Sequence, residues 1–128
     1  MQFKDTQSIY LQIADLMMDH ILEGRWGDSE RIPSIRESAV QLEVNPNTVT
    51  RFYNYLQDLG IIFNRRGIGY FTADDALHQV KQLKRQQFIQ HTLPEVFRSM
   101  KLLDIEIGEL EKLFNASETD KQRSSSEE

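Results

Sequence analysis

The sequence of 128 residues contains no cysteine, three prolines and one tryptophan. Without cysteine the chain has no disulfide framework and no thiolate metal site, which fits a reducing compartment. No apolar run approaches the length of a membrane span, and the first residues, MQFKDTQS, lack a signal-peptide pattern. We therefore expect a soluble cytoplasmic protein with no membrane contact, of one ordinary domain with a small appendage.

The chain also has little that would support catalysis or metal binding. His20, His78 and His91 have no partner at metal-ligand spacing, and Asp74 and Asp75 are explained by the preference of helix N-termini for negative charge. No nucleophile with a base and an orienting group occurs, and no glycine-rich phosphate loop. We expect no enzymatic activity, no cofactor and no metal.

Net positive charge is absent as well, because the formal net charge is −5 and the sequence pI is about 5.2, whereas DNA-binding domains are often basic. Four arginines nevertheless lie on elements expected to converge on one face, namely Arg36, Arg51, Arg65 and Arg66. Non-specific affinity for nucleic acid should be low, since it comes mainly from neutralised phosphates.

Two short helices joined by a tight turn form the centre of the predicted fold. Ser34 and Glu37 have the spacing of a capping box at the start of the first helix. Asn45 as N-cap and Pro46 at the first helical position begin the second. Gly60 is placed to end that second helix, which is roughly 13 residues long.

The two sides of the second helix differ in chemistry. Its apolar side carries Val49, Phe52, Tyr53, Leu56 and Leu59, and its outward side carries Asn47, Thr50, Arg51 and Asn54. Amides, a hydroxyl and a guanidinium match base edges and phosphates in a major groove, whereas an ordinary solvated face would more often carry Glu and Lys. Tyr53 is expected to pack in the core rather than stack on bases.

A small hairpin follows, with strands at residues 61–63 and 69–71 flanking the tip Arg65-Arg66-Gly67. Alone, the arginine pair would be solvated turn charge. Directly after two such helices it favours contact with a phosphate or a minor groove.

The pattern P-S-I-R-E-x-A-x-x-L-x-V-N-P-N-T-V, then Y-x-x-L-x-x-x-G and R-R-G-x-G-Y-F, resembles the winged helix-turn-helix of the GntR superfamily of bacterial transcription regulators. The resemblance runs from about Ile9 to Phe71. It implies that Arg36 grips a phosphate or a groove edge, that Asn45, Asn47 and Thr48 lie at the N-terminus of the recognition helix, and that Arg66 and Gly67 lie at the wing tip.

Two positions depart from the family pattern. Many relatives carry Arg where this chain has Pro46, so that contact is either absent or made by Arg51. Phe52 stands where a small residue is usual, which predicts different local packing.

Helices are also expected on both sides of this motif. From Ser8 to Gly24 the apolar spacing predicts a supporting helix, with Met17 and Met18 as core filler, and residues 30–32 are a possible short strand paired with the hairpin. Beyond Thr72 a long helix is expected to end at Pro94, where another opens, followed by a short third helix over residues 106–114. The polar tail is expected to be disordered.

The helices beyond Thr72 would expose a wide apolar surface as a monomer, and self-association would cover it. The expected seam consists of Leu83, Phe88, Val96, Phe97, Met100 and Leu110. A short helical region of this kind resembles the YtrA-like branch of the superfamily, whose members dimerise there.

The sequence thus predicts a mostly α fold with a small β-hairpin. A winged helix-turn-helix domain is expected at residues 1–72, a helical dimerisation region at 73–115 and a disordered tail at 116–128. The predicted function is a homodimeric repressor that binds an inverted-repeat operator in double-stranded DNA. The alternative is a winged-helix protein-interaction module without DNA binding, which the acidic pI and Pro46 would allow. A small-molecule effector is left open, and one would bind between protomers, because the helices offer no dedicated pocket.

Overall fold

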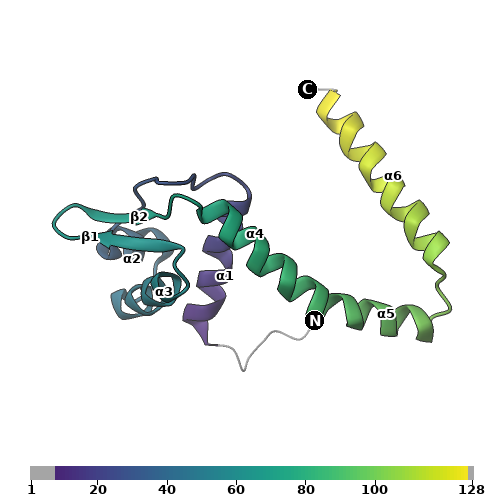
Figure 1. Ribbon diagram of the computed structural model, residues 1–128, viewed down its shortest axis with the longest axis horizontal. Helices are drawn as coiled ribbons and strands as arrows, with labels where there is room; N and C mark the ends of the chain where they lie inside the picture. The colour runs from purple at the N-terminus through teal and green to yellow at the C-terminus, as the bar shows by residue number, and fades with distance from the viewer. Residues whose placement is uncertain (1–7, 127–128) are drawn as a thin grey trace. The chain divides into compact units, whose positions relative to one another are not determined.

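The computed structural model describes the backbone of residues 8–126 and the side chains of residues 8–118, in two units. The head unit ends at Lys84 and contains α1 (Ile9–Leu22), α2 (Ile35–Leu42), α3 (Pro46–Asp58), β1 (Ile62–Arg65), β2 (Gly69–Thr72) and most of α4 (Ala76–Gln87). The helical unit begins at Arg85 and contains the end of α4, the π-helical η1 (Phe88–Thr92), α5 (Leu93–Leu102) and α6 (Ile107–Ser126). Figure 1 labels the α-helices and the two strands along the chain. Residues 1–7 of the expected winged helix-turn-helix domain and residues 127–128 of the expected tail lie outside the described part.

The paired helices α2 and α3 begin at the predicted residues. The N–H of Glu37 donates to the Ser34 hydroxyl and the N–H of Ser34 donates to the Glu37 carboxylate, both at 3.0 Å, which confirms the capping box. The hydrogen bond from the Ser34 N–H to the Glu37 carboxylate is the main cause of the lowered pKa of Glu37. Between the helices, Glu43 adopts left-handed φ and ψ of 55° and 45° and turns the chain. Asn45 then caps α3, with Pro46 in its first turn, as predicted.

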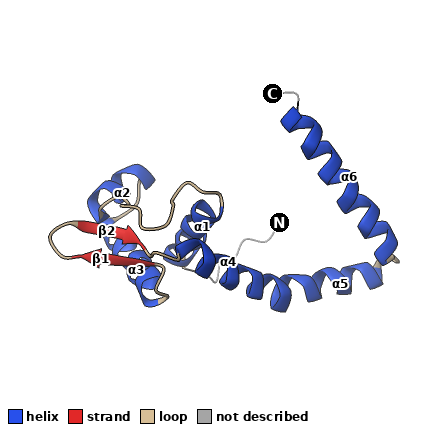
Figure 2. Cartoon of the chain, turned by 45° about the horizontal axis from the view of Figure 1, so that its top comes forward, coloured by secondary structure: helices blue, strands red, loops and turns tan. Residues whose placement is uncertain are grey.

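The hairpin is antiparallel, with Ile62 opposite Thr72 and Arg65 opposite Gly69. The strand predicted at residues 30–32 is reduced to one bridge, Arg31 to Phe71, at the hairpin's edge. Figure 2 shows the two strands in red, with a loop that extends beyond α2 and α3. The loop between the strands, residues 66–68, is exposed.

The core of the head lies where α1, α3, the hairpin and α4 meet. Met17 and Met18 are buried there, as predicted, together with Tyr53. Phe52, the departure from the family pattern, is fully buried and packs edge-on against the Tyr53 ring, 5.0 Å between centroids. The Tyr53 hydroxyl donates to the carbonyl of Pro33, and burial raises the Tyr53 pKa to about 12.

Most of α4 belongs to the head, so the compact unit extends beyond the boundary expected at residue 72. Ala76 and Val80 are fully buried in the core, and Leu83 packs against it. The start of the helix is tied to the loop after α1, because Leu77 N–H donates to the Asp28 carboxylate at 2.9 Å. The apolar side chains of α4 therefore pack in the core of the head.

The helix predicted to open at Pro94 is α5, which begins at Leu93 and has Pro94 in its first turn. The helical run before Pro94 does not end there, however, and that part of the prediction was wrong. The chain passes from α4 through the single π-helical turn η1 into α5. A proline ring clashes with the carbonyl four residues earlier and offers no N–H, and a wider turn before it removes that conflict without breaking the helix. A break does occur after Leu102, where Asp104 has a φ of 56°.

The tail expected to be disordered from residue 116 is helical in its described part, because α6 continues to Ser126. A low apolar content does not stop a helix that earlier turns have nucleated. Glu, Lys, Gln and Arg are good helix formers, and no glycine or proline follows Gly108. Residues 127–128 lie outside the described part. Within residues 8–126, no helix has the length and apolarity needed to cross a membrane.

Candidate nucleic-acid interface

The outward face of α3 is accessible in its first three turns. Asn47, Arg51 and Asn54 are exposed, whereas Thr48 and Thr50 are half-buried. The Thr50 hydroxyl donates to the carbonyl of Pro46 at 3.1 Å, which occupies its proton and leaves its lone pairs as acceptors. The opposite face is buried in the core, so α3 has only this side free to contact a ligand.

Asn45 has a structural task in addition to any contact. Its side-chain oxygen accepts from the N–H of Asn47 at 2.8 Å and so caps α3. The amide NH₂ remains available as a donor, because the residue is exposed. Arg36 is exposed in the first turn of α2, where the sequence predicts it.

Arg51 has an aromatic partner that the sequence reasoning missed. Its guanidinium carbon lies 4.4 Å from the centroid of the Tyr10 ring on α1, and that ring makes an edge contact with Tyr55 of α3. Stacking on a ring reduces the freedom of an arginine while its planar edge keeps its donors. An aromatic residue in the first turn of the supporting helix is a weak signal, since only the packing of α1 on α3 brings it to Arg51.

The hairpin carries a second group of cations, although Arg65, expected at the tip, is the last residue of β1. Arg65 lies over the rings of Phe71 and Phe63, with its guanidinium carbon 4.7 Å and 5.5 Å from their centroids. Arg66 and Gly67 are exposed in the loop, where Gly67 has a φ of 78° that side chains rarely adopt. The two arginines therefore differ, because one is held on aromatic rings and the other extends from the turn.

Arg31 is a further cation beside the hairpin that the sequence reasoning did not single out. A Cβ atom added at Gly69 would lie 3.3 Å from its Nε, so the guanidinium rests directly against this glycine. Its pairing with Phe71 adds it to the edge of the hairpin. The sequence signal for Arg31 is its place as the basic residue of segment 30–32, which is expected to pair with the hairpin.

All ten residues predicted to contact DNA lie in the head, on α2, on α3 or its cap, and in the hairpin. The set is Arg36, Asn45, Asn47, Thr48, Thr50, Arg51, Asn54, Arg65, Arg66 and Gly67. Their contacts with nucleic acid stay predictions. An amide-rich helix face and a basic loop in the same unit have the donors and acceptors for base edges and phosphates.

The six residues predicted for a dimer seam are divided between the two units. Leu83 packs against the core of the head. In the helical unit Met100 is buried, Val96 is half-buried, and Phe88, Phe97 and Leu110 are exposed. A groove of about 390 Å³ between α5 and α6 is lined by Val96, Met100 and Leu110 among others, so the expectation that these helices offer no pocket was wrong.

Comparison with known proteins gives the same assignment as the motif. The sequence model of bacterial regulatory proteins, gntR family, matches residues 9–72. The chain is 43% identical over 75 residues to the uncharacterized HTH-type transcriptional regulator YhcF of Bacillus subtilis, covering 59% of this chain and 62% of YhcF. It is 36% identical over 73 residues to the HTH-type transcriptional repressor YtrA of the same organism, covering 57% of this chain and 56% of YtrA.

A solved structure extends the likeness beyond the head. The chain superposes on a GntR-family transcriptional regulator from Bacteroides thetaiotaomicron with a TM-score of 0.75 and 42% identity. The match covers 89% of this chain and 99% of that one. The two Bacillus relatives, by contrast, are matched over less than two thirds of their own length.

Proposed function

The chain belongs to the gntR family of bacterial regulatory proteins, and we propose that it is a homodimeric transcriptional repressor that binds an inverted-repeat operator in double-stranded DNA. The observation that carries the proposal is the outward face of α3. Exposed amides and a ring-stacked arginine follow a capped helix N-terminus there, and the same unit carries a basic hairpin loop.

The face of α3 is the reader of base sequence. Asn pairs with adenine and Arg with guanine through two hydrogen bonds each in the major groove. Asn47 and Arg51 are one helical turn apart, so they project in the same direction and reach neighbouring bases. Pro46 carries no side-chain donor, so Arg51 is the one cation on this face of α3 that can meet a guanine or a phosphate.

The hairpin supplies contacts that hold the head on the duplex without reading a unique code. Arg66 in the exposed loop reaches a phosphate or a narrow minor groove. Arg65, stacked on the ring of Phe71, adds a second positive charge at the hairpin. With a net charge of −5, such local cations matter more than the overall field of the protein.

The helical unit joins two copies. Phe97 is 40% exposed, Leu110 37% and Phe88 51%, and more apolar side chains are exposed along α5 and α6. Exposed apolar surface of this extent marks an interaction site. A second copy is the proposed occupant, since two-fold symmetry gives the two reading heads that an inverted repeat requires.

Repression follows from occupancy of the operator. YtrA, a relative with 36% identity, is named a repressor, and a dimer bound across a promoter excludes the transcription machinery. Any small-molecule effector would bind where two copies meet, because the α5–α6 groove shares Val96, Met100 and Leu110 with the proposed seam.

The test is enrichment of duplexes from a random DNA pool by the full chain, at low and moderate salt. We expect an inverted repeat to be enriched and to survive competition with a scrambled duplex. The double variant Asn47→Ala/Arg51→Ala should fail to enrich it while keeping the parent's melting temperature. If no sequence is enriched at either salt, the protein-interaction alternative replaces this proposal.

A further inference from the structure

Arg31 lies on the same face of the hairpin as Arg65, although the two are distant in sequence. The backbone of Arg31 forms an antiparallel bridge with Phe71, and Gly69, two residues earlier on β2, lies opposite Arg65. Side chains of directly opposite residues, and of residues two apart on one strand, point to the same face of a sheet. Arg31, Phe71 and Arg65 therefore share one face, whereas Arg66 lies in the loop.

Contacts within the head place both guanidinium groups over β2. A Cβ atom added at Gly69 would lie 3.3 Å from Nε of Arg31 and 3.5 Å from its Nη2, so this guanidinium uses the space that a side chain would fill. The guanidinium carbon of Arg65 lies 4.7 Å from the centroid of the Phe71 ring. Successive positions on one face of a strand are about 7 Å apart. The two groups therefore lie over neighbouring positions of β2, and an anion between them is within reach of both.

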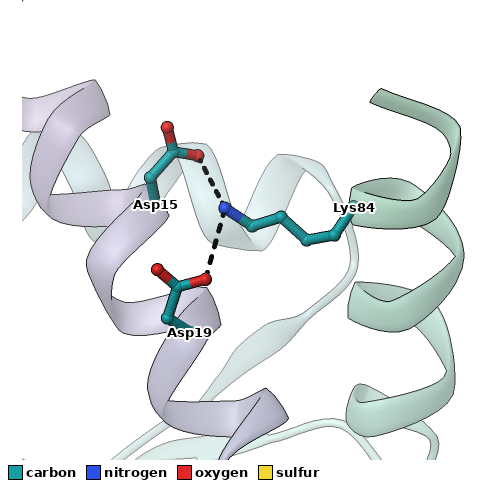
Figure 3. A network of polar contacts seen from close by, with 3 residues as sticks. All are labelled: Asp15, Asp19 and Lys84. Atoms are coloured by element: carbon teal, nitrogen blue, oxygen red, sulfur yellow. Dashed lines mark hydrogen bonds and ion pairs between the residues drawn. The ribbon is translucent and has the colours of Figure 1, made fainter. Parts of the chain in front are cut away.

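The protein does not neutralise these two charges. Lys84 shows the opposite case, because its Nζ lies 3.3 Å from a carboxylate oxygen of Asp15 and 3.6 Å from one of Asp19 (Figure 3). Neither Arg31 nor Arg65 makes an ion pair within the described part of the chain, and both are exposed. Two like charges on one face repel each other, so an anion that lies between them is favoured.

Glu37 is an acidic residue that Arg31 influences without pairing with it. The pKa of the Glu37 carboxyl is lowered most by the hydrogen bonds with Ser34, and the positive charge of Arg31 contributes less than they do. The carboxylate accepts from the N–H of Ser34 at 3.0 Å, which holds it in the capping box at the start of α2. The guanidinium of Arg31 therefore keeps its donors for a ligand.

We propose that Arg31 and Arg65 bind one backbone phosphate of the DNA between them. The inference rests on the proposed function, and it adds Arg31, which lies outside α2, α3 and the hairpin strands, to the residues that contact the duplex. A phosphodiester has two exposed oxygens that share one negative charge, and the planar fork of a guanidinium matches them. Because both groups are held on the hairpin before binding, they lose little freedom on contact. The contact fixes the position of the head on the duplex and reads no base.

The experiment uses the full chain and the enriched operator, in which one phosphate at a time is replaced by an uncharged methylphosphonate. Arg31→Met and Arg65→Met remove one charge each, Arg31→Gln is a second neutral variant with a polar end, and Arg31→Lys keeps the charge. Arg25→Met is the matched control, since Arg25 is exposed in the same unit and its charge is already paired with Glu23 at 3.3 Å. Fluorescence anisotropy at fixed salt gives the affinity for each duplex.

We expect one linkage in a half-site at which loss of the phosphate charge weakens parent binding about two- to fivefold, the range of an exposed ion pair. The three neutral variants, Arg31→Met, Arg31→Gln and Arg65→Met, should bind the unmodified operator more weakly and lose their sensitivity to that same linkage. Arg31→Lys should recover most of the sensitivity, and Arg25→Met should keep the parent's profile. Melting temperatures should stay those of the parent.

Arg31 variants that remain as sensitive to that linkage as the parent would overturn the inference, even if their overall affinity falls, because a merely structural role leaves the phosphate contact in place. A parent profile with no linkage that depends on both arginines would overturn it as well. The proposed function stands in both cases, since the parent still binds its operator. A parent protein that binds no duplex would instead refute the proposed function, and the inference with it.

Discussion

The stacking of Arg51 on Tyr10 leads to the sharpest prediction about DNA reading. The guanidinium carbon lies 4.4 Å from the ring centroid, which is within the range of a cation–π contact. Such contacts contribute about 0.5–1 kcal/mol at exposed sites. If stacking holds Arg51 in the geometry in which it meets a base, Tyr10→Leu should weaken operator binding by that amount, about two- to fivefold.

Arg51→Ala should cost more, about 1–3 kcal/mol of operator binding, because it removes the base contact together with its support. In the double variant the loss should be no greater than for Arg51→Ala alone, so the cycle yields a coupling energy of about 0.5–1 kcal/mol. Tyr10→Phe keeps the ring and should bind like the parent. Fluorescence anisotropy with a labelled operator, at fixed salt, gives the affinities of the parent and of these four variants.

Arg25→Ala is the matched control, since it removes one cation from an exposed loop of the head and should leave affinity nearly unchanged. Two results would refute the reasoning. Operator affinity that Arg51→Ala leaves intact would remove this side chain from recognition. Tighter binding by Tyr10→Leu would mean that Arg51 must leave the ring in order to reach DNA.

Four further outcomes are expected. Asn47→Ala should weaken operator binding by about 1–3 kcal/mol with normal thermal melting, and unchanged affinity would exclude it as a base contact. Removing Arg65 and Arg66 together should flatten the slope of log K against log salt by up to about 2, and a slope equal to the parent's would mean that the wing meets no phosphate. Since burial raises the Tyr53 pKa from 10.0 to about 12, its contribution to stability is complete below pH 10 and is lost as the pH rises towards 12. Urea unfolding of the parent and Tyr53→Phe across that window checks this sign, because the variant should show a smaller loss. A protein that ends at Lys84 should stay folded but be monomeric by light scattering, and a truncated dimer would place the interface in the head.

The truncation after Lys84 follows the unit boundary of the structure, which lies later in the chain than the boundary expected at residue 72. A cut at residue 73 would follow from the sequence, but it would remove Ala76 and Val80 from the core of the head. Their spacing on α4 is the same whether a stripe faces its own head or a second copy, so sequence periodicity alone cannot separate the two. For that reason the sequence predicts Leu83 in the dimer seam, whereas the structure packs it against the head.

Local signals gave the helix-turn-helix and the hairpin almost residue by residue. The capping box at Ser34, the cap at Asn45 and the left-handed Gly60 each depend on neighbours within a few positions, and the structure has all three. Pro94 was misread because its effect depends on whether the preceding turn can widen, which η1 does. The general rule that proline breaks helices holds only where that adjustment is not made.

The candidate site was predictable as far as residue type and helix face determine it. The exposed face of α3 and the basic loop follow from spacing alone. Tyr10 under Arg51, Arg31 against Gly69 and Lys84 between two carboxylates were not predictable, because each joins segments distant in sequence. Pairs of this kind arise from tertiary packing and carry no periodic signature.

The central claim is that two copies of this chain together read one inverted repeat, and the mass of the complex tests it most directly. The full chain, of 15.0 kDa, is mixed with a duplex that carries the enriched sequence, and the complex is weighed by light scattering or sedimentation. The account predicts two chains for each full operator and a loss of affinity of about 10²–10⁴ when one half-site is scrambled, because the second head then has no target. One chain for each duplex, or equal affinity for full and half operators, would contradict it.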